Sequence, residues 1–257
     1  MKRLLPAATA ELERWRGEDL TLPIWWRDDD AVMPTPALER LIALADRFEA
    51  PLHLAVIPEP ASAELADRVR TAPDIFALTH GWKHLNHAPP DQKKAEFGAH
   101  RPSGTMLEEI AAGRRRLDEL FAAQALPVFT PPWNRIAPEL LDGLPAIGFA
   151  AISTFTPRKA KFAARDLLQI NTHLDPVAWK SGGGLLDPRL LDAQLARELA
   201  ARRTGGADYA EPYGILTHHL VQDDATWAFT EAMLEVFASS RAAAWTPPLK
   251  EFRNASS

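Results

Sequence analysis

The segment Leu22-Pro-Ile-Trp-Trp-Arg-Asp-Asp-Asp30 passes from an apolar run directly into a cluster of charged residues. A short apolar run that ends in polar residues, with no two-residue hairpin turn after it, is typical of a strand in a parallel sheet. The same pattern recurs about seven times along the chain, and longer amphipathic segments lie between the runs. The predicted strands are residues 22–26, 52–57, 75–78, 127–129, 149–153, 167–171 and 214–217.

Four of the segments that follow these strands have recognisable helix starts. Thr35-Pro36 suits an N-cap followed by a proline at the first helical position. Thr105 and Glu108 have the spacing of a capping box. The two remaining predicted helices begin at Asp187-Pro188 and at Asp224.

This alternation of strands and helices predicts an α/β fold in which a parallel sheet is covered by helices. No glycine-rich dinucleotide motif follows the first strand, so a closed or nearly closed barrel is favoured over an open sheet. No linker or change in composition divides the chain, and we therefore expect a single domain over residues 1–257. In such barrels the chemistry lies where the strands end, at their carboxyl termini.

The composition of the 257 residues excludes several classes of protein. Lys and Arg number 29 against 34 Asp and Glu, and this net charge of −5 argues against nucleic-acid binding, which usually needs a basic face. The chain has no cysteine, which excludes disulfides, thiolate zinc sites, iron–sulfur clusters and a cysteine nucleophile. A bound metal would therefore have histidine and carboxylate ligands.

The N-terminal residues resemble a signal peptide only briefly. Their apolar stretch is interrupted at Pro6 and runs into Glu11, whereas a secretory core needs roughly 7–15 apolar residues. No later run approaches the ~18 apolar residues of a membrane span. We therefore expect a cytoplasmic protein with no membrane association, and the sequence carries no signal for an oligomeric state.

Candidate metal ligands follow the first and third predicted strands. Three adjacent carboxylates, Asp28 to Asp30, repel one another, and a bound cation is the simplest way to hold them together; an exposed acidic turn is the alternative. His80 and His84 are four residues apart, a spacing that places both imidazoles on one face of a helical turn. Both rings could then meet one metal ion.

Tryptophans lie close to these candidate ligands. Trp82 stands between the two histidines, and Trp133 and Asn134 follow the fourth strand in a loop stiffened by two prolines. Trp133 offers a flat apolar wall of the kind on which sugars stack. The alternative for each tryptophan is ordinary packing in the core.

The last two predicted strands also end in polar side chains. Asp175 and Trp179 follow the sixth strand, where Asp175 could orient a charged partner or begin a turn before a proline. His218 and His219 end the seventh strand. Because side chains alternate along a strand, only one of these histidines faces the mouth of the barrel.

In this order the residues resemble the motifs of the polysaccharide deacetylase superfamily, carbohydrate esterase family 4 and its relatives. The resemblance covers nearly the whole chain and implies a distorted (β/α)7 barrel. The segments that carry it are Asp29-Asp30, His80-x-x-x-His84, Phe129 to Trp133, Asp175-x-x-x-Trp179 and Leu216-x-His218.

The resemblance also implies roles for these residues. Asp29 is the implied general base and His218 the implied general acid, and Asp175 is a further candidate catalytic residue. The implied metal ligands are Asp30, His80 and His84. The candidate substrate-binding residues are Trp82, Trp133, Asn134, Trp179 and His219.

The sequence departs from the family pattern in two places. A third acid adjoins the aspartate pair, which leaves Asp28-Asp29 as an alternative to Asp29-Asp30. The third motif normally begins with arginine, but Thr130 stands at that position, so Arg135 or Arg27 would have to pair with the base. These departures suggest a divergent, cytoplasmic branch of the superfamily.

The implied function is a metal-dependent hydrolase that removes an acyl group, such as acetyl, from an N-acylated sugar or a related amide. Its substrate would be a small molecule or an oligosaccharide. Zinc is the expected cofactor, although cobalt, nickel and manganese accept the same ligands. Two alternatives stay open: a metal-dependent amidase or other C–N hydrolase acting on a small non-sugar substrate, and a carbohydrate-binding barrel without catalysis.

Overall fold

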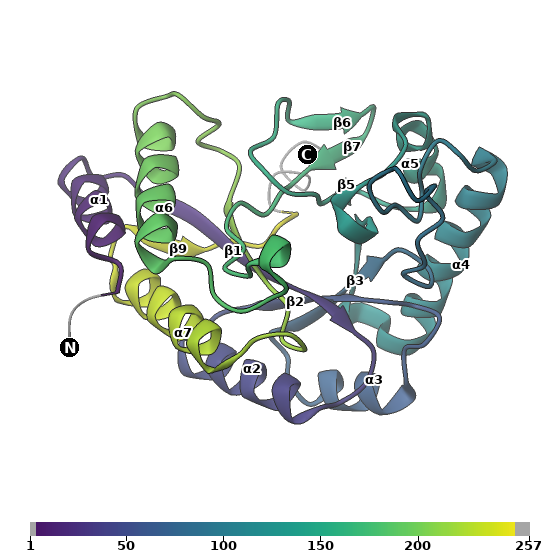
Figure 1. Cartoon of the computed structure of the whole chain (residues 1–257), viewed down its shortest axis with the longest axis horizontal. Coiled ribbons are helices and arrows are strands. Elements are labelled where there is room, and N and C mark those ends of the chain that lie inside the picture. The colour runs from purple at the N-terminus through teal and green to yellow at the C-terminus, as the bar shows by residue number, and fades with distance from the viewer. Residues whose placement is uncertain (1–3, 250–257) are drawn as a thin grey trace.

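Strands from the whole length of the chain pair into one curled sheet (Figure 1). Over residues 4–249, which the computed structural model describes, the strand order is β6-β7-β5-β4-β3-β2-β1-β8, and β9 pairs with the start of β1. The strands are β1 (Leu22–Ala31), β2 (Leu52–Val56), β3 (Ile75–His80), β4 (Ala125–Thr130), β5 (Ala151–Ile152), β6 (Phe162–Ala164), β7 (Leu167–Gln169), β8 (Tyr213–Thr217) and β9 (Ala243–Trp245).

Each of the seven predicted strands is confirmed, and the ladders that join them within the sheet are parallel. The strands β6 and β9 were not predicted. Both are three residues long, and β6 pairs with β7 in the antiparallel direction. Such short segments lack the alternation on which a strand prediction depends.

The chain beyond β7 brings the two edges of the curled sheet together. Leu174 forms a parallel bridge with Ile215 of β8, and the Leu216 amide donates to the Leu174 carbonyl at 2.9 Å. The segment that follows β7 therefore lies beside β8, and seven parallel segments complete a ring. The predicted distorted (β/α)7 barrel is confirmed.

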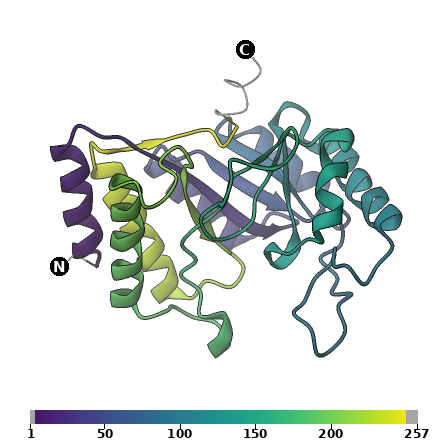
Figure 2. The same ribbon diagram turned by 90° about the horizontal axis from the view of Figure 1, so that it is seen from above.

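Helices cover the outside of this barrel, as the two views at right angles show (Figures 1 and 2). Among the described residues, none of them is long and apolar enough to cross a membrane. The helices are α1 (Pro6–Gly17), α2 (Pro36–Arg47), α3 (Ala63–Arg70), α4 (Ser103–Phe121), α5 (Leu144–Ile147), α6 (Pro188–Arg203) and α7 (Asp224–Ser239).

Three of the four predicted helix starts are confirmed. Thr35 caps α2, Asp187 caps α6, and α7 begins at Asp224 behind the N-cap Asp223. The capping box at Thr105 is wrong, because α4 begins two residues earlier, directly after Pro102. The fixed φ of that proline leads the chain into the helix without a side-chain cap.

The side chains of β1 alternate between the barrel interior and the layer under the helices. Trp25 packs in a cluster to which six strands of the barrel or their ends contribute, whereas Trp26 packs with residues of the outer helices. Arg27 and Asp29 continue the face of Trp25, and Asp28 continues the face of Trp26. This alternation determines where each charged group of β1 lies.

A buried histidine in β2 links the stability of the barrel to pH. His53 is 2% exposed, packs against the rings of Trp25 and Phe76, and donates a hydrogen bond from Nδ1 to the Trp26 carbonyl at 2.9 Å. Burial lowers the pKa of His53 to about 4, and the hydrogen bond to Trp26 opposes this shift only in part. His53 is therefore neutral in the folded protein at pH values where the unfolded chain would protonate it.

We expect His53→Phe to flatten the acid limb of the stability profile. Below its ordinary pKa of 6.5, His53 takes up a proton only on unfolding, so stability is lost between pH 6.5 and about pH 4. A pKa shift of this size lowers the free energy of unfolding by about 3 kcal/mol as the pH falls through this range. Urea unfolding at several pH values measures the slope, and the exposed His87→Phe serves as the control. Equal slopes for the two variants would contradict this assignment.

Candidate active site

The three consecutive aspartates at the end of β1 point in different directions. Asp28 and Asp29 alternate as strand residues do, so Asp29 faces the barrel interior and Asp28 faces the helix layer. The ladder to β2 then slips between Asp29 and Ala31, and Asp30 has a positive φ of 76°. This bulge turns Asp30 toward His80, so the mouth of the barrel receives two adjacent carboxylates instead of one.

Asp30 meets the two predicted histidine ligands at the mouth of the barrel. Its Oδ1 lies 3.1 Å from Nε2 of His80 and 3.4 Å from Nε2 of His84. The three side chains offer ligand atoms that all lie within 4.8 Å of one another. This arrangement favours the alignment of Asp29-Asp30, and not Asp28-Asp29, with the aspartate pair of the resembling family.

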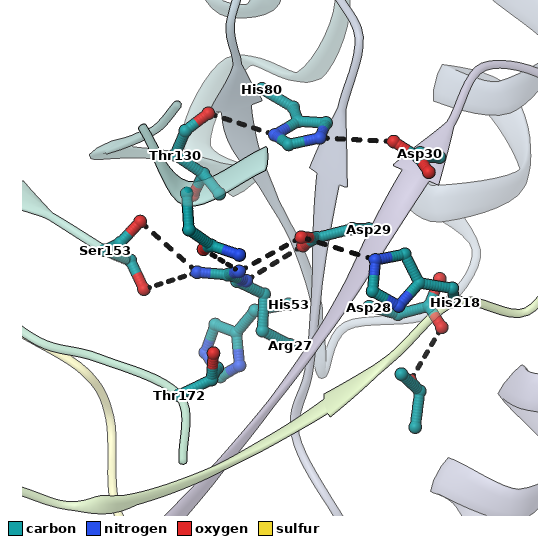
Figure 3. Close-up of polar contacts among 12 residues, drawn as sticks. Arg27, Asp28, Asp29, Asp30, His53, His80, Thr130, Ser153, Thr172 and His218 are labelled. Atoms are coloured by element: carbon teal, nitrogen blue, oxygen red, sulfur yellow. Dashed lines mark hydrogen bonds and ion pairs between the residues drawn. The ribbon is translucent and has the colours of Figure 1, made fainter. Parts of the chain in front are cut away.

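The hydrogen bonding of His80 fits a cation between these groups. The Nδ1 atom lies 3.0 Å from the Thr130 carbonyl oxygen, which can only accept, so Nδ1 carries the hydrogen (Figure 3). In a neutral ring Nε2 would then face another acceptor, Asp30, and two acceptors at 3.1 Å repel unless a proton or a metal ion lies between them. Two imidazoles and one carboxylate are a donor set that zinc and related metals accept.

Charge–charge contacts shift the pKa values of this cluster in opposite directions. Burial disfavours the charged form of His80, but the carboxylates of Asp29 and Asp30 outweigh it and raise the pKa. Burial alone would raise the pKa of Asp30, yet the hydrogen bond and charge of His80, with smaller effects of other histidines, lower it. Both shifts favour a positive charge beside the carboxylate of Asp30, which a bound cation would also supply.

The two histidines converge by a different route from the one predicted. His80 is the last residue of β3, and the chain continues as a loop in which Gly81 and His84 have φ values of 64° and 57°. The predicted helical turn is therefore wrong, although both rings do reach Asp30. A strand end followed by a turn with left-handed residues brings the rings to a centroid distance of 5.1 Å.

Asp29 lies deeper in the barrel and is held by an arginine from its own strand. Arg27 Nε forms an ion pair with Asp29 Oδ1 at 2.8 Å, and Nη2 donates to Oδ2 at 3.0 Å. The guanidinium is itself fixed by the Ser153 hydroxyl at 2.7 Å (Figure 3). It also donates to the Asn134 side-chain oxygen at 2.9 Å. Asn134, a candidate substrate-binding residue, thus orients Arg27. Ser153 was not singled out in the sequence, and no motif marks it.

His218 lies between the carboxylates of Asp29 and Asp175. Its Nε2 lies 3.9 Å from Asp29 Oδ2, and its Nδ1 lies 3.8 Å from Asp175 Oδ2. Asp175 also accepts a hydrogen bond at 2.7 Å from the indole of Trp179, whose ring packs edge-on against His218. Burial raises the pKa of Asp175 despite the nearby charge of His218 and the hydrogen bond from Trp179.

His219 lies on the opposite side of the sheet from His218. It is 1% exposed, and its Nδ1 and backbone amide both contact Asp28. Asp28 also accepts from the Thr217 hydroxyl at 2.6 Å, so one carboxylate contacts both neighbours of His218 in the chain. The predicted substrate contact of His219 has no support here, because its side chain is buried and engaged by Asp28.

The candidate tryptophans differ in how they lie. Trp133 packs on the ring of His84 at a centroid distance of 4.3 Å, and Trp179 is 52% exposed beside His218. Both therefore stand at the mouth of the barrel. Trp82 is partly buried against a cluster that includes Phe97 and Phe129, where packing accounts for it.

Known proteins resemble this chain in three-dimensional structure but not detectably in sequence. No family model matches the chain, and no curated protein matches it in sequence. A Mycobacterium smegmatis protein assigned to the polysaccharide deacetylases superposes with a TM-score of 0.63 and 14% identity, covering 92% of this chain and 93% of its own. This chain has the polysaccharide deacetylase fold.

Two further structures with this fold carry more specific descriptions. A family 4 acetyl xylan esterase from Clostridium thermocellum, in complex with a cobalt ion, has a TM-score of 0.53 and 12% identity and covers 91% of each chain. A peptidoglycan deacetylase from Bacillus subtilis has a TM-score of 0.54 and 12% identity, with 92% of this chain and 95% of its own covered. The predicted resemblance to the superfamily is confirmed at the level of the fold.

Within this deacetylase fold, Arg27 is the arginine that pairs with Asp29. The other candidate, Arg135, donates instead to the Lys94 carbonyl at the surface. Thr130, which stands where the third motif has arginine, offers its carbonyl to His80. The sequence held one signal for this outcome, since residues 27 and 29 share a face of the same strand.

We expect Arg27→Met to destabilise the protein by about 3–5 kcal/mol, because it leaves the carboxylate of Asp29 buried without its partner. Adding Asp29→Asn should recover part of this loss, since the two substitutions remove one interaction. Urea denaturation at neutral pH measures both effects. Arg135→Met is the control and should cost less than about 0.5 kcal/mol. Similar losses for the two arginine variants would show that the pairing is wrong.

Proposed function

We propose that this protein is a metal-dependent hydrolase that removes an acyl group, most simply acetyl, from an N-acylated sugar or a related amide. The observation that carries the proposal is the convergence of two sets of groups at one end of the barrel. The Asp30, His80 and His84 cluster lies beside Asp29, which in turn lies 3.9 Å from His218. Catalysed amide hydrolysis uses a Lewis acid, a base and an acid; a metal held by the cluster would supply the first, and Asp29 and His218 could supply the other two.

The cluster of Asp30, His80 and His84 would hold the metal. Its donor set suits zinc, and cobalt, nickel or manganese would be accepted by the same ligands. When bound, such a cation acts as a Lewis acid that polarises an amide carbonyl and makes water easier to deprotonate. The Thr130 carbonyl supports this role, because it holds the His80 ring with Nε2 directed at the cluster.

Asp29 is the proposed base. Its two oxygens are oriented by Arg27, and it lies next in the chain to the metal-ligating Asp30. Arg27 is completely buried, so its guanidinium keeps one orientation and thereby orients the carboxylate of Asp29. A proton taken from water by Asp29 would leave a nucleophile close to the polarised carbonyl.

His218 is the proposed acid. An amine is a poor leaving group until it is protonated. His218 could supply this proton, because its Nε2 lies near Asp29 and its Nδ1 lies near Asp175. Asp175 would orient the ring and stabilise its charged form, as a carboxylate beside a catalytic histidine does. Trp179 and Trp133 flank these groups and would form apolar walls for the substrate.

The substrate class depends on where the protein works. We propose a cytoplasmic location, where the protein would meet oligosaccharides and small amides, not polymeric glycans. The structural neighbours include an acetyl xylan esterase and a peptidoglycan deacetylase. Acetylated sugars are therefore the first substrates to test, followed by small non-sugar amides.

We expect purified protein to contain about one transition metal per chain, because the cluster provides a single set of ligands. Either His80→Ala or His84→Ala should reduce that content strongly, as measured by elemental analysis after dialysis against limiting zinc. The exposed His87→Ala, in the same loop, should retain the metal. A wild-type protein that binds no metal, or histidine variants that bind it fully, would refute the proposed metal site.

We expect Asp29→Asn and His218→Ala each to lower the rate of acetate release by about 10²–10⁴-fold, the usual contribution of a positioned base or acid. Acetylated chito-oligosaccharides and a panel of small amides are the substrates, and metal content is measured in parallel. Turnover of the amides alone would identify an amidase. Sugar binding with no turnover, in protein that holds metal, would identify a non-catalytic barrel.

A further inference from the structure

Glu96 is a buried carboxylate outside the groups described above. It is 1% exposed and lies in the long loop between β3 and α4. Its Oε1 accepts hydrogen bonds from the backbone amides of Lys83 at 2.7 Å and Leu85 at 3.5 Å. Its Oε2 accepts from the amide of Trp82 at 3.2 Å. These three amides belong to the turn that carries His84.

The turn from Gly81 to Leu85 has no regular secondary structure to support it. The strand β3 ends at His80, and the following residues include His84 in the left-handed region, where a residue with a Cβ is strained. Backbone amides of such a turn that water does not reach need acceptors from elsewhere in the chain. Glu96 provides two oxygens to three of these amides.

Gly81 allows the carboxylate to come this close. A Cβ at position 81 would lie 2.2 Å from Oε2 of Glu96 and 2.6 Å from Cγ of Pro132. A φ of 64° also favours glycine at this position. The glycine between the two candidate ligands, His80 and His84, thus serves the contact with Glu96.

The backbone at Glu96 and Phe97 is held in place by contacts with other parts of the chain. The next residue, Phe97, is fully buried, forms a parallel bridge with Ile136, and accepts from the Ala137 amide at 2.7 Å. The backbone carbonyl of Glu96 accepts from Arg101, whose guanidinium also pairs with Glu109. The carboxylate therefore projects from a fixed piece of backbone.

We infer that Glu96 is a positioning residue for His84. By binding the amides on both sides of His84, the carboxylate holds the strained turn so that Nε2 stays beside Asp30 and His80. The inference rests on the proposed metal-binding function of that cluster. Glu96 contacts the backbone of the ligand turn, and it acts on metal affinity only through His84.

The test compares Glu96→Ala and Glu96→Gln with Glu109→Gln in the full-length protein. Glu109 of α4 is the matched control, because it is a nearby partly buried glutamate, and glutamine at this position keeps an oxygen to which Arg101 can donate, so the contact of Arg101 with the Glu96 carbonyl is retained. Cobalt(II) is the probe: competition with a chromogenic chelator measures its Kd, and its visible absorption reports the coordination. Thermal unfolding of the metal-free variants fixes a working temperature at which each is folded.

We expect Glu96→Ala to weaken cobalt binding by about 10–100-fold, the usual range when an outer partner of a metal ligand is removed. Its absorption spectrum should shift toward that of His84→Ala. Glu96→Gln preserves the volume of the side chain and should lose less, since its single carbonyl oxygen can still accept from one amide. Glu109→Gln should bind cobalt like the wild type.

A purely structural role for Glu96 would lower the unfolding temperature and leave the Kd and the spectrum of the folded variants unchanged, which would overturn the inference. If Glu96→Ala does not fold, the comparison of Glu96→Gln with Glu109→Gln decides the question by the same two readouts. A wild-type protein that binds no cobalt would instead refute the proposed metal site, and the positioning role with it.

Discussion

Neutralisation of three consecutive carboxylates at the buried end of β1 is the constraint on which the rest of the site depends. Each aspartate has its own basic partner: His219 for Asp28, Arg27 for Asp29, and the pair His80 and His84 for Asp30. Unpaired charges on the buried Asp28 and Asp29 would be costly, since burial removes the water that would otherwise solvate them. The three partners come from three different parts of the barrel, so the acidic segment links them together.

Geometry at the end of β1 separates these pairs. Strand alternation sends Asp28 to the outer face and Asp29 to the interior, and the bulge at Asp30 turns a second carboxylate toward the mouth. One carboxylate thereby faces the candidate ligands while its neighbour faces His218. A regular strand would have placed Asp30 behind the sheet, next to Asp28, and the cluster with His80 could not form.

The supporting contacts differ from those that the family motifs led us to expect. The arginine beside the proposed base comes from β1 itself, and the loop residue Asn134 orients it. The second candidate ligand, His84, is carried by a strained turn whose amides bind the buried Glu96. In this protein the candidate metal cluster is therefore supported by contacts that no sequence motif indicates.

The sequence by itself determined the seven strands, the barrel, the starts of α2, α6 and α7, and the candidate set Asp29, Asp30, His80, His84 and His218. The strands, the barrel and the helix starts follow from local signals, namely apolar period and capping residues, whereas the choice of Asp29, Asp30 and His218 within their polar runs came from the resemblance to the family. Only the tertiary structure decided that Arg27 and not Arg135 pairs with Asp29, that His219 is buried against Asp28, and that a turn, not a helix, carries His84. The physical reason is that a buried charge selects its partner from whatever lies within a few ångströms, and that neighbourhood is created by strand pairing between residues far apart in the chain.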